Sequence, residues 1–201
     1  MRITTHEQLR ALYAQPTERA LRKQLAALDR HCQAFIALSP FAVLATSDAS
    51  GRLDATPRGG TPGFVVVQDE HTLLLGDAPG NNRLDALHNL LENPRAGLLF
   101  MVPGVDETLR VNGRVELSTD PADVQACSDA RRVPKVVLRI TVEEAYLHCA
   151  KALMRSGLWQ AEARIVRDRL PTMNQMIHDQ LGWDAPPESQ ADMLRRYAPD
   201  L

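Results

Sequence analysis

The stretch TLLLGDAPGNNRLDALHNLLENPRAGLLFMV, residues 72–102, decides the fold of this chain. It opens with an apolar run at 72–76, which predicts a strand, and continues through a turn at Pro79-Gly80. Leucines then recur at helical spacing between residues 82 and 92, which predicts a short amphipathic helix. A second apolar run at 97–102 predicts another strand, so the stretch indicates a sheet with one inserted helix.

Further strands are predicted on both sides of this stretch. Period-two alternation, β-branched residues and turn signals mark strands at 41–47, 53–59, 63–67, 108–118 and 133–149. Short loops join them into hairpins, the first across Asp48–Gly51, where the glycine is expected at positive φ. A short helix is predicted to open at Thr119-Asp120-Pro121. The pattern predicts an α+β fold, an antiparallel β-barrel of about six or seven strands with helices before, inside and after it.

The chain is expected to form a single domain, because 201 residues fall within the usual size of one. We expect N-terminal helices in residues 1–40, the barrel in residues 41–149 and a C-terminal helical segment in residues 150–201. In the first part, a stripe of apolar side chains predicts one amphipathic helix that ends at Ser39-Pro40. The stripe comprises Leu21, Leu25, Leu28, Cys32 and Phe35.

Composition excludes several classes of protein. The 23 basic and 25 acidic residues give a net charge of −2, which argues against a general nucleic-acid-binding protein. No apolar run approaches the ~20 residues of a membrane span and no secretory signal is visible, so we expect a cytoplasmic protein without membrane contact. Three widely spaced cysteines without a CxxC pair indicate a reducing compartment. Rossmann, Walker, HExxH and GxSxG motifs are absent.

The strongest candidate site is the turn that leads into the inserted helix. Exposed backbone N–H groups and the helix dipole at such a position bind anions. Asn81 and Asn82 stand where the helix N-cap is expected, and Arg83 in the first turn adds a guanidinium suited to a phosphate. A positive charge in the first turn is unfavourable in the field of the helix dipole, unless a bound anion lies there and neutralises it. The turn therefore predicts a phosphate site, with a well-capped helix and a solvated arginine as the alternative.

Two other segments carry candidate binding residues. Thr56–Gly60 ends a predicted edge strand, where glycines let a ligand approach the backbone and Arg58 can point toward the same site; a plain loop is the alternative. Lys151 and Arg155 share one helical face, so their charges repel unless an anion neutralises them. His148 and Cys149 face opposite ways on an extended segment, which favours a structural histidine and a buried cysteine over a metal-chelating pair.

In combination, these elements resemble the pyridoxamine 5′-phosphate oxidase-like family, whose members have an FMN-binding split β-barrel. The resemblance covers about residues 41–118, including a short helix that ends in Asn93-Pro94-Arg95 and a hairpin into Arg110–Ser118. The segment Tyr146–Trp159 resembles a subgroup of flavoproteins with a His-Cys-x-Lys-Ala-x-x-Arg-Ser pattern. The phosphate turn reads Gly-Asn-Asn-Arg where the oxidase itself has Ser-Arg-Lys, and the oxidase's C-terminal Arg-x-His substrate signature is absent.

The resemblance implies a homodimer with FMN at the subunit interface and an unidentified small-molecule substrate. The flavin is expected to contact Thr56, Arg58, Gly59, Asn81, Asn82, Arg83, Arg110, Lys151, Arg155, Ser156 and Trp159. Arg83 is expected to bind the phosphate, and Arg110 or Lys151 to lie near N1–O2 of the ring. Because the substrate signature is missing, we expect an FMN-dependent oxidoreductase of another small molecule. The alternatives are a flavin-binding sensor without turnover and a haem-binding barrel with His148 as ligand.

Overall fold

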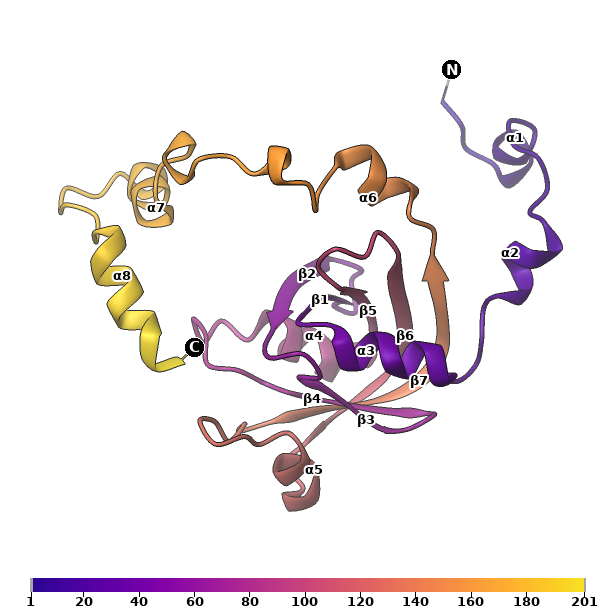
Figure 1. The fold of residues 1–201 in the computed structure, drawn as a ribbon, viewed down its shortest axis with the longest axis horizontal. Helices are drawn as coiled ribbons and strands as arrows, with labels where there is room; N and C mark the ends of the chain where they lie inside the picture. The colour runs from indigo at the N-terminus through magenta and orange to yellow at the C-terminus, as the bar shows by residue number, and fades with distance from the viewer. Residues whose placement is uncertain (1, 201) are drawn as a thin grey trace. The chain divides into compact units, whose positions relative to one another are not determined.

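The computed structural model describes residues 2–200 (Figure 1). The chain divides into two compact units, one that runs to Arg155 and one that starts at Ser156. The first unit holds the whole sheet and five helices around it, with a sixth at its end. The second unit holds two α-helices and short 3₁₀ turns. Among the described residues, no helix combines the length and the apolar character needed to cross a membrane.

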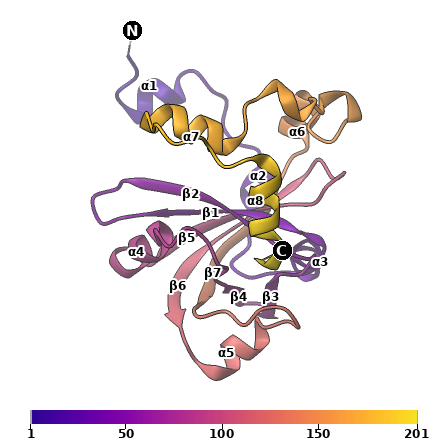
Figure 2. The same ribbon diagram turned by 90° about the vertical axis from the view of Figure 1, so that its left-hand side faces the viewer.

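All seven strands form one antiparallel sheet in the order β2-β1-β5-β6-β7-β4-β3. The strands are β1 (Phe41–Ser47), β2 (Leu53–Gly59), β3 (Val65–Asp69), β4 (Thr72–Gly76), β5 (Arg95–Met101), β6 (Thr108–Ser118) and β7 (Val137–His148). The sheet curls around the core, as two views at right angles show (Figures 1 and 2). This arrangement confirms the predicted α+β fold with an antiparallel barrel and helices before, inside and after it.

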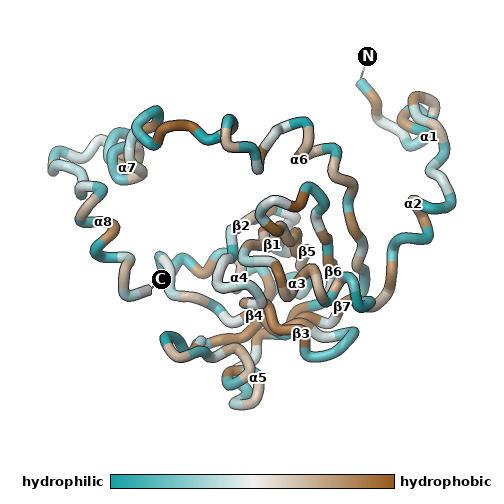
Figure 3. Tube along the Cα trace, viewed as in Figure 1, coloured by the Kyte–Doolittle hydropathy of each residue, from teal (hydrophilic) through white to brown (hydrophobic). Residues whose placement is uncertain are grey.

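The core lies on one face of the curled sheet because the strands alternate apolar and polar side chains. Leu44 of β1, Phe100 of β5 and Leu109 of β6 are fully or almost fully buried. Figure 3 shows hydrophobic residues along strands of the sheet, including β3 and β4. Phe100 pairs with Ala42 on one side and Leu109 on the other, so it lies between β1 and β6 in the middle of the sheet.

The helices follow some of the predicted caps and breaks. They are α1 (His6–Arg10), α2 (Glu18–Arg22), α3 (Arg30–Leu38), α4 (Asp85–Glu92), α5 (Pro121–Ala126), α6 (Lys151–Ser156), α7 (Met173–Leu181) and α8 (Gln190–Tyr197). Asp120 caps α5 by accepting from the Ala122 N–H, and Pro121 occupies its first position, as predicted. In the second unit, Glu188 links α7 to α8 by accepting from Asn174 and Arg196.

The single amphipathic helix predicted from the stripe between Leu21 and Phe35 is wrong. The chain breaks after α2, and Leu25 instead forms a two-way backbone bridge with Ala145 of β7. Asp29 then caps α3 by accepting from the N–H groups of His31 and Cys32. Leu21 is therefore 62% exposed while Cys32 is buried. Beyond Thr141, β7 extends past its partner β4, and the bridge from Leu25 satisfies backbone groups there that a continuous helix would leave unpaired.

Several smaller boundaries also differ from the sequence prediction. The strand expected at residues 97–102 runs over Arg95–Met101, and the one expected at 133–149 begins only at Val137. The hairpin strand expected at residues 63–67 runs instead over Val65–Asp69. The inserted helix starts at Asp85 rather than at residue 82, because Asn82 (φ 58°) and Leu84 (φ 59°) adopt left-handed conformations that cannot continue an α-helix. By contrast, Gly51 has φ 84° in the first hairpin loop, as predicted.

Candidate functional site

The edge strand β2 carries polar side chains on its core-side face. Its pairing with β1 sets Arg58 beside Ala42, Thr56 beside Leu44 and Asp54 beside Thr46. Ala42, Leu44 and Thr46 are buried, so the three β2 side chains lie on the same face of the sheet as the core. Within residues 2–200, no further strand pairs with the outer edge of β2. The concave face of the sheet therefore ends in a charged and polar strip instead of an apolar one.

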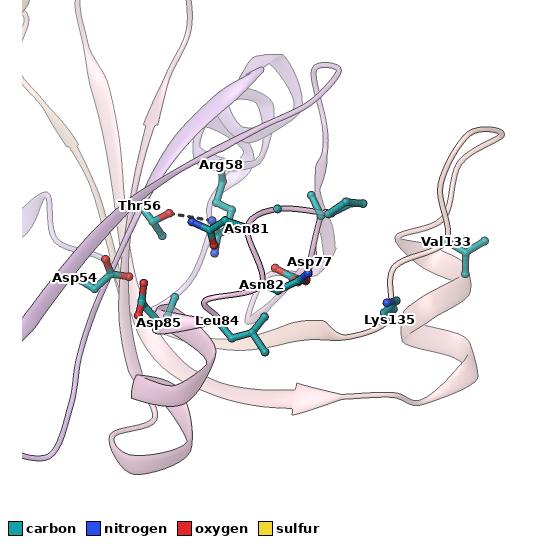
Figure 4. A pocket seen from close by; sticks show the side chains of 14 residues that line it. Asp54, Thr56, Arg58, Asp77, Asn81, Asn82, Leu84, Asp85, Val133 and Lys135 are labelled. Carbon is teal, nitrogen blue, oxygen red and sulfur yellow. Dashed lines mark hydrogen bonds between the residues drawn. The ribbon is translucent and has the colours of Figure 1, made fainter. Parts of the chain in front are cut away.

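A cavity of about 450 Å³ adjoins this strip (Figure 4). Its walls come from β2, from the turn between β4 and α4, from the first residues of α4 and from the loop before β7. The lining residues are Asp54, Thr56, Arg58, Asp77, Ala78, Pro79, Gly80, Asn81, Asn82, Leu84, Asp85, Ala86, Val133 and Lys135. Three segments far apart in the sequence thus contribute charged groups to one cavity.

A second cavity, of about 300 Å³, shares Arg58, Thr56 and the Ala78–Asn81 turn with the first. It adds Arg132 from the loop before β7 and the Phe64 side chain from the loop before β3. No carboxylate stands among its lining residues, whereas the first cavity has three aspartates. Arg58 therefore lies between a cavity of mixed charge and a cavity whose charged lining residues are arginines.

The guanidinium of Arg58 is held in place with one donor left over. Its Nη1 donates to Thr56 Oγ1 at 3.0 Å and to the Pro57 carbonyl at 3.2 Å. Its Nε is buried and has no hydrogen-bond partner within residues 2–200. An unpartnered buried donor costs free energy unless a ligand or water satisfies it. A cationic donor fixed in a cavity is therefore suited to an anionic ligand.

The turn before α4 differs from the capped helix start that the sequence predicts. Leu84, not an asparagine, occupies the N-cap position, and no side chain caps the helix there. Asn81 Oδ1 instead accepts from the Arg83 N–H at 3.0 Å. Two left-handed non-glycine residues so close together are strained, and such strain is concentrated at functional sites. Asn81 and Asn82 line the first cavity, but Arg83 is absent from the lining of both cavities.

Arg110 lies on the opposite face of the sheet from Arg58. The register runs from Pro57 of β2 through Val43 and Leu99 to Arg110, and these residues share the face turned away from the core. Arg110 Nη2 donates to Glu144 at 2.6 Å, and its guanidinium stacks 4.2 Å from the centre of the Tyr146 ring. Its buried Nε has no partner in the described part of the chain. Within one chain, therefore, Arg110 and the cavity are separated by the sheet.

The residues predicted around β7 and α6 do not line either cavity. Lys151 and Arg155 lie in α6, where Arg155 Nε donates to the Lys151 carbonyl at 2.9 Å. Ser156 and Trp159 belong to the second compact unit. His148 packs against Tyr146 with ring centres 4.8 Å apart. Burial, together with repulsion from Arg110 and Lys23, lowers the pKa of His148.

Gly59 of β2, which was also predicted as a binding residue, lines the second cavity.

The cysteines differ in their exposure. Burial, reinforced by Asp29, raises the pKa of the Cys32 thiol to about 11, and burial also raises the pKa of Cys127. Cys149 is exposed, so the expectation of a buried cysteine there is wrong. The reason is its place just past the end of β7, where no partner strand covers it.

Only Cys149 is expected to react rapidly with a thiol reagent in the folded protein at neutral pH, because reaction requires access and thiolate character. With a reagent that releases a coloured thiolate on reaction, the absorbance followed against time should show one thiol per chain that reacts rapidly. Cys149→Ser should abolish that fast phase and leave ligand binding unchanged. A fast phase that survives in Cys149→Ser would contradict this assignment.

Several cavity residues were not predicted from the sequence. Asp54 could have been found, because it continues the period-two alternation of Thr56 and Arg58 along β2. Lys135 and Arg132 carry no local signal. They reach the site because β7 pairs with β4, with Gly76 opposite Val137. Among residues 2–200, no group of three or more His, Cys, Asp or Glu side chains is placed to hold a metal ion.

Comparison with known proteins identifies the family. The model of the pyridoxamine 5′-phosphate oxidase family matches residues 28–149, which span α3 and the whole sheet. The chain belongs to this family. The match confirms the predicted resemblance, and it includes β2, the turn before α4 and the loop before β7. No curated protein sequence matches the chain.

The chain is also similar to solved structures at low sequence identity. A histidine-to-alanine variant of HupZ from Group A Streptococcus is 21% identical, with a TM-score of 0.50 over 60% of this chain and 99% of that one. An FMN-binding protein from Syntrophomonas wolfei is 12% identical, with a TM-score of 0.47 over 58% and 83%. A Clostridium acetobutylicum protein related to general stress protein 26 is 13% identical, with a TM-score of 0.46 over 59% and 85%. The HupZ likeness shows the fold alone.

Proposed function

We propose that this protein binds FMN in the cavity beside Arg58 and works as an FMN-dependent oxidoreductase on a small molecule. The observation that carries the proposal is the Arg58 guanidinium, which is fixed by Thr56 and keeps a buried Nε without a partner. Family membership makes a flavin the ligand to test first. The protein's own part is to hold and orient the flavin, while the flavin supplies the redox chemistry when bound.

The residues present fit a phosphate-bearing flavin. Arg58 offers charge-assisted donors, Asn81 and Asn82 add amide groups, and Arg132 adds a second guanidinium on the carboxylate-free side. Phe64, Leu75 and the prolines of the second cavity provide apolar surface beside these donors. An anion next to an apolar wall is the combination that a flavin phosphate and its attached chain require. Arg83 and Arg110 line neither cavity.

The protein is also proposed to form a homodimer through the outer face of β2, β1 and β5. Most residues that share this outer face are apolar: Phe41, Val43, Ala45, Leu53, Ala55, Pro57, Gly97, Leu99 and Met101. Ser47, opposite Leu53, and Gly59, opposite Phe41, lie on the same face, and Leu53 is 87% exposed. A largely apolar sheet face of this kind indicates a protein–protein interface. Arg110 borders this face, so it could reach a flavin only when that flavin belongs to a second copy.

Leu99→Glu is expected to convert a wild-type dimer into a monomer at micromolar concentration. A carboxylate in the middle of an apolar interface would be buried without a partner, which costs several kcal/mol. Sedimentation velocity measures the change, and circular dichroism checks that the fold persists. Leu91→Glu is the matched control, because Leu91 is 72% exposed on α4 away from this face. A wild-type monomer, or a dimer that survives in Leu99→Glu, would contradict the interface.

The absorption spectrum of the protein after mixing with FMN and removal of free ligand tests the proposed function. Bound flavin should give absorption bands at about 370 and 450 nm. Bleaching of these bands by a nicotinamide reductant, followed by recovery in air, would support electron transfer. A stable flavin spectrum without reduction would favour the sensor alternative. A Soret band after mixing with haem and no retention of FMN would overturn the proposal in favour of haem binding.

A further inference from the structure

Arg83 and Asp85 form an ion pair beside the first cavity. Arg83 Nε donates to Asp85 Oδ2 at 2.8 Å, and Arg83 Nη2 donates to Oδ1 at 3.3 Å. The guanidinium fork thus engages both carboxylate oxygens. The side chains are 71% and 51% exposed, so water and salt reach the pair.

A second carboxylate faces the same arginine. Asp85, and after it Asp54, raise the pKa of Arg83. Both aspartates line the first cavity and lie at the end of it away from Lys135 (Figure 4). Arg83 does not line this cavity, although the turn around it does. The negative charge therefore faces the cavity while the positive charge is held beside it.

Helix stabilisation alone does not explain this pair. A carboxylate in the first turn of α4 interacts favourably with the helix dipole, which accounts for Asp85. The same dipole disfavours a guanidinium just before the helix start, where Arg83 lies. The two-pronged geometry of the pair is also the one by which a guanidinium binds a phosphate. Asp85 therefore occupies the donors that a phosphate would use.

We infer that Asp85 is an internal competitor for the ligand's phosphate: it occupies the guanidinium donors of Arg83 at the edge of the cavity, and a phosphate-bearing flavin must displace it from them. This inference rests on the proposed function and concerns the regulation of the same site. An exposed ion pair is weak, so the phosphate dianion of a ligand can replace the Asp85 carboxylate as the partner of Arg83. Asp85 then lowers the affinity for phosphate-bearing ligands and leaves ligands without phosphate unaffected.

Asp85→Asn tests the inference by direct titration of FMN and riboflavin into the protein. FMN is expected to bind about three- to fivefold more tightly to the variant. This is the largest gain in affinity expected when the ligand no longer has to break an exposed ion pair. Riboflavin affinity should not change. Arg83→Ala should reduce FMN affinity more in the Asp85→Asn background than in the wild type, because only there is Arg83 free to bind the phosphate.

Glu143→Gln is the matched control, since it removes one negative charge from an exposed 2.8 Å pair with Arg95 and lines neither cavity. Unchanged FMN affinity in Asp85→Asn would overturn the inference and leave the proposed function intact. Equal tightening in Glu143→Gln, or for riboflavin, would also overturn it, because net charge or the ring would then be the cause. A wild-type protein that binds neither flavin would instead refute the proposed function.

Discussion

Arg58→Ala is expected to weaken FMN binding by about 10- to 150-fold, the equivalent of the roughly 1.5–3 kcal/mol that a hydrogen bond to a charged group contributes. The loss is expected because the variant removes the buried Nε donor and the charge together. Riboflavin has the same ring without the phosphate, so its affinity should change much less. Fluorescence titration of both flavins into wild type and variant measures the difference.

Arg95→Ala controls for the loss of one positive charge, because Arg95 pairs with Glu143 on the surface and lines neither cavity. Arg58→Lys should recover part of the affinity, since an ammonium keeps the charge but lacks the planar fork. Equal losses for FMN and riboflavin in Arg58→Ala would place Arg58 at the ring. Unchanged affinity for both would remove Arg58 from the site.

Phe100→Ala is expected to lower the free energy of unfolding by about 3–5 kcal/mol. Phe100 is fully buried between β1 and β6, and the strand next to β1 is β2, which carries Arg58. Truncation leaves a cavity that the rigid sheet cannot fill. Urea denaturation measures the loss, and Phe100→Leu should cost much less because most of the volume stays. A loss below 1 kcal/mol in Phe100→Ala would contradict the position of Phe100 in the core.

The strands could be predicted closely because their signal is local. The bounds of β1, β2, β4 and β6 agree with the sequence prediction, since alternation and turn residues are sufficient to define them. The break between α2 and α3 could not be predicted this way. It arises because the part of β7 beyond Thr141 extends past β4, and the segment around Leu25 pairs with it there. Tertiary pairing of this kind overrides helix periodicity.

The candidate site was predictable only in its local parts. Thr56, Arg58, Asn81 and Asn82 were singled out from turns and strand ends, and the structure brings them to one cavity. Lys135 joins them through the pairing of β4 with β7, which no local pattern encodes.

The role of the Arg83 turn was harder to predict. Of its two left-handed residues, Asn82 is of a type that tolerates positive φ, but Leu84 carries no sequence signal for it. The pair between Arg83 and Asp85 follows from that backbone. A helix that started at residue 82 would have placed Arg83 in its first turn.

The distance from Arg58 Nε to the nearest phosphate oxygen, in a crystal structure of the protein with FMN, tests the central claim most directly. We expect a charge-assisted hydrogen bond of about 2.7–2.9 Å, with the phosphate beside Thr56 and Asn81, which line both cavities. A phosphate bound elsewhere, with Arg58 Nε still unpartnered, would contradict the account.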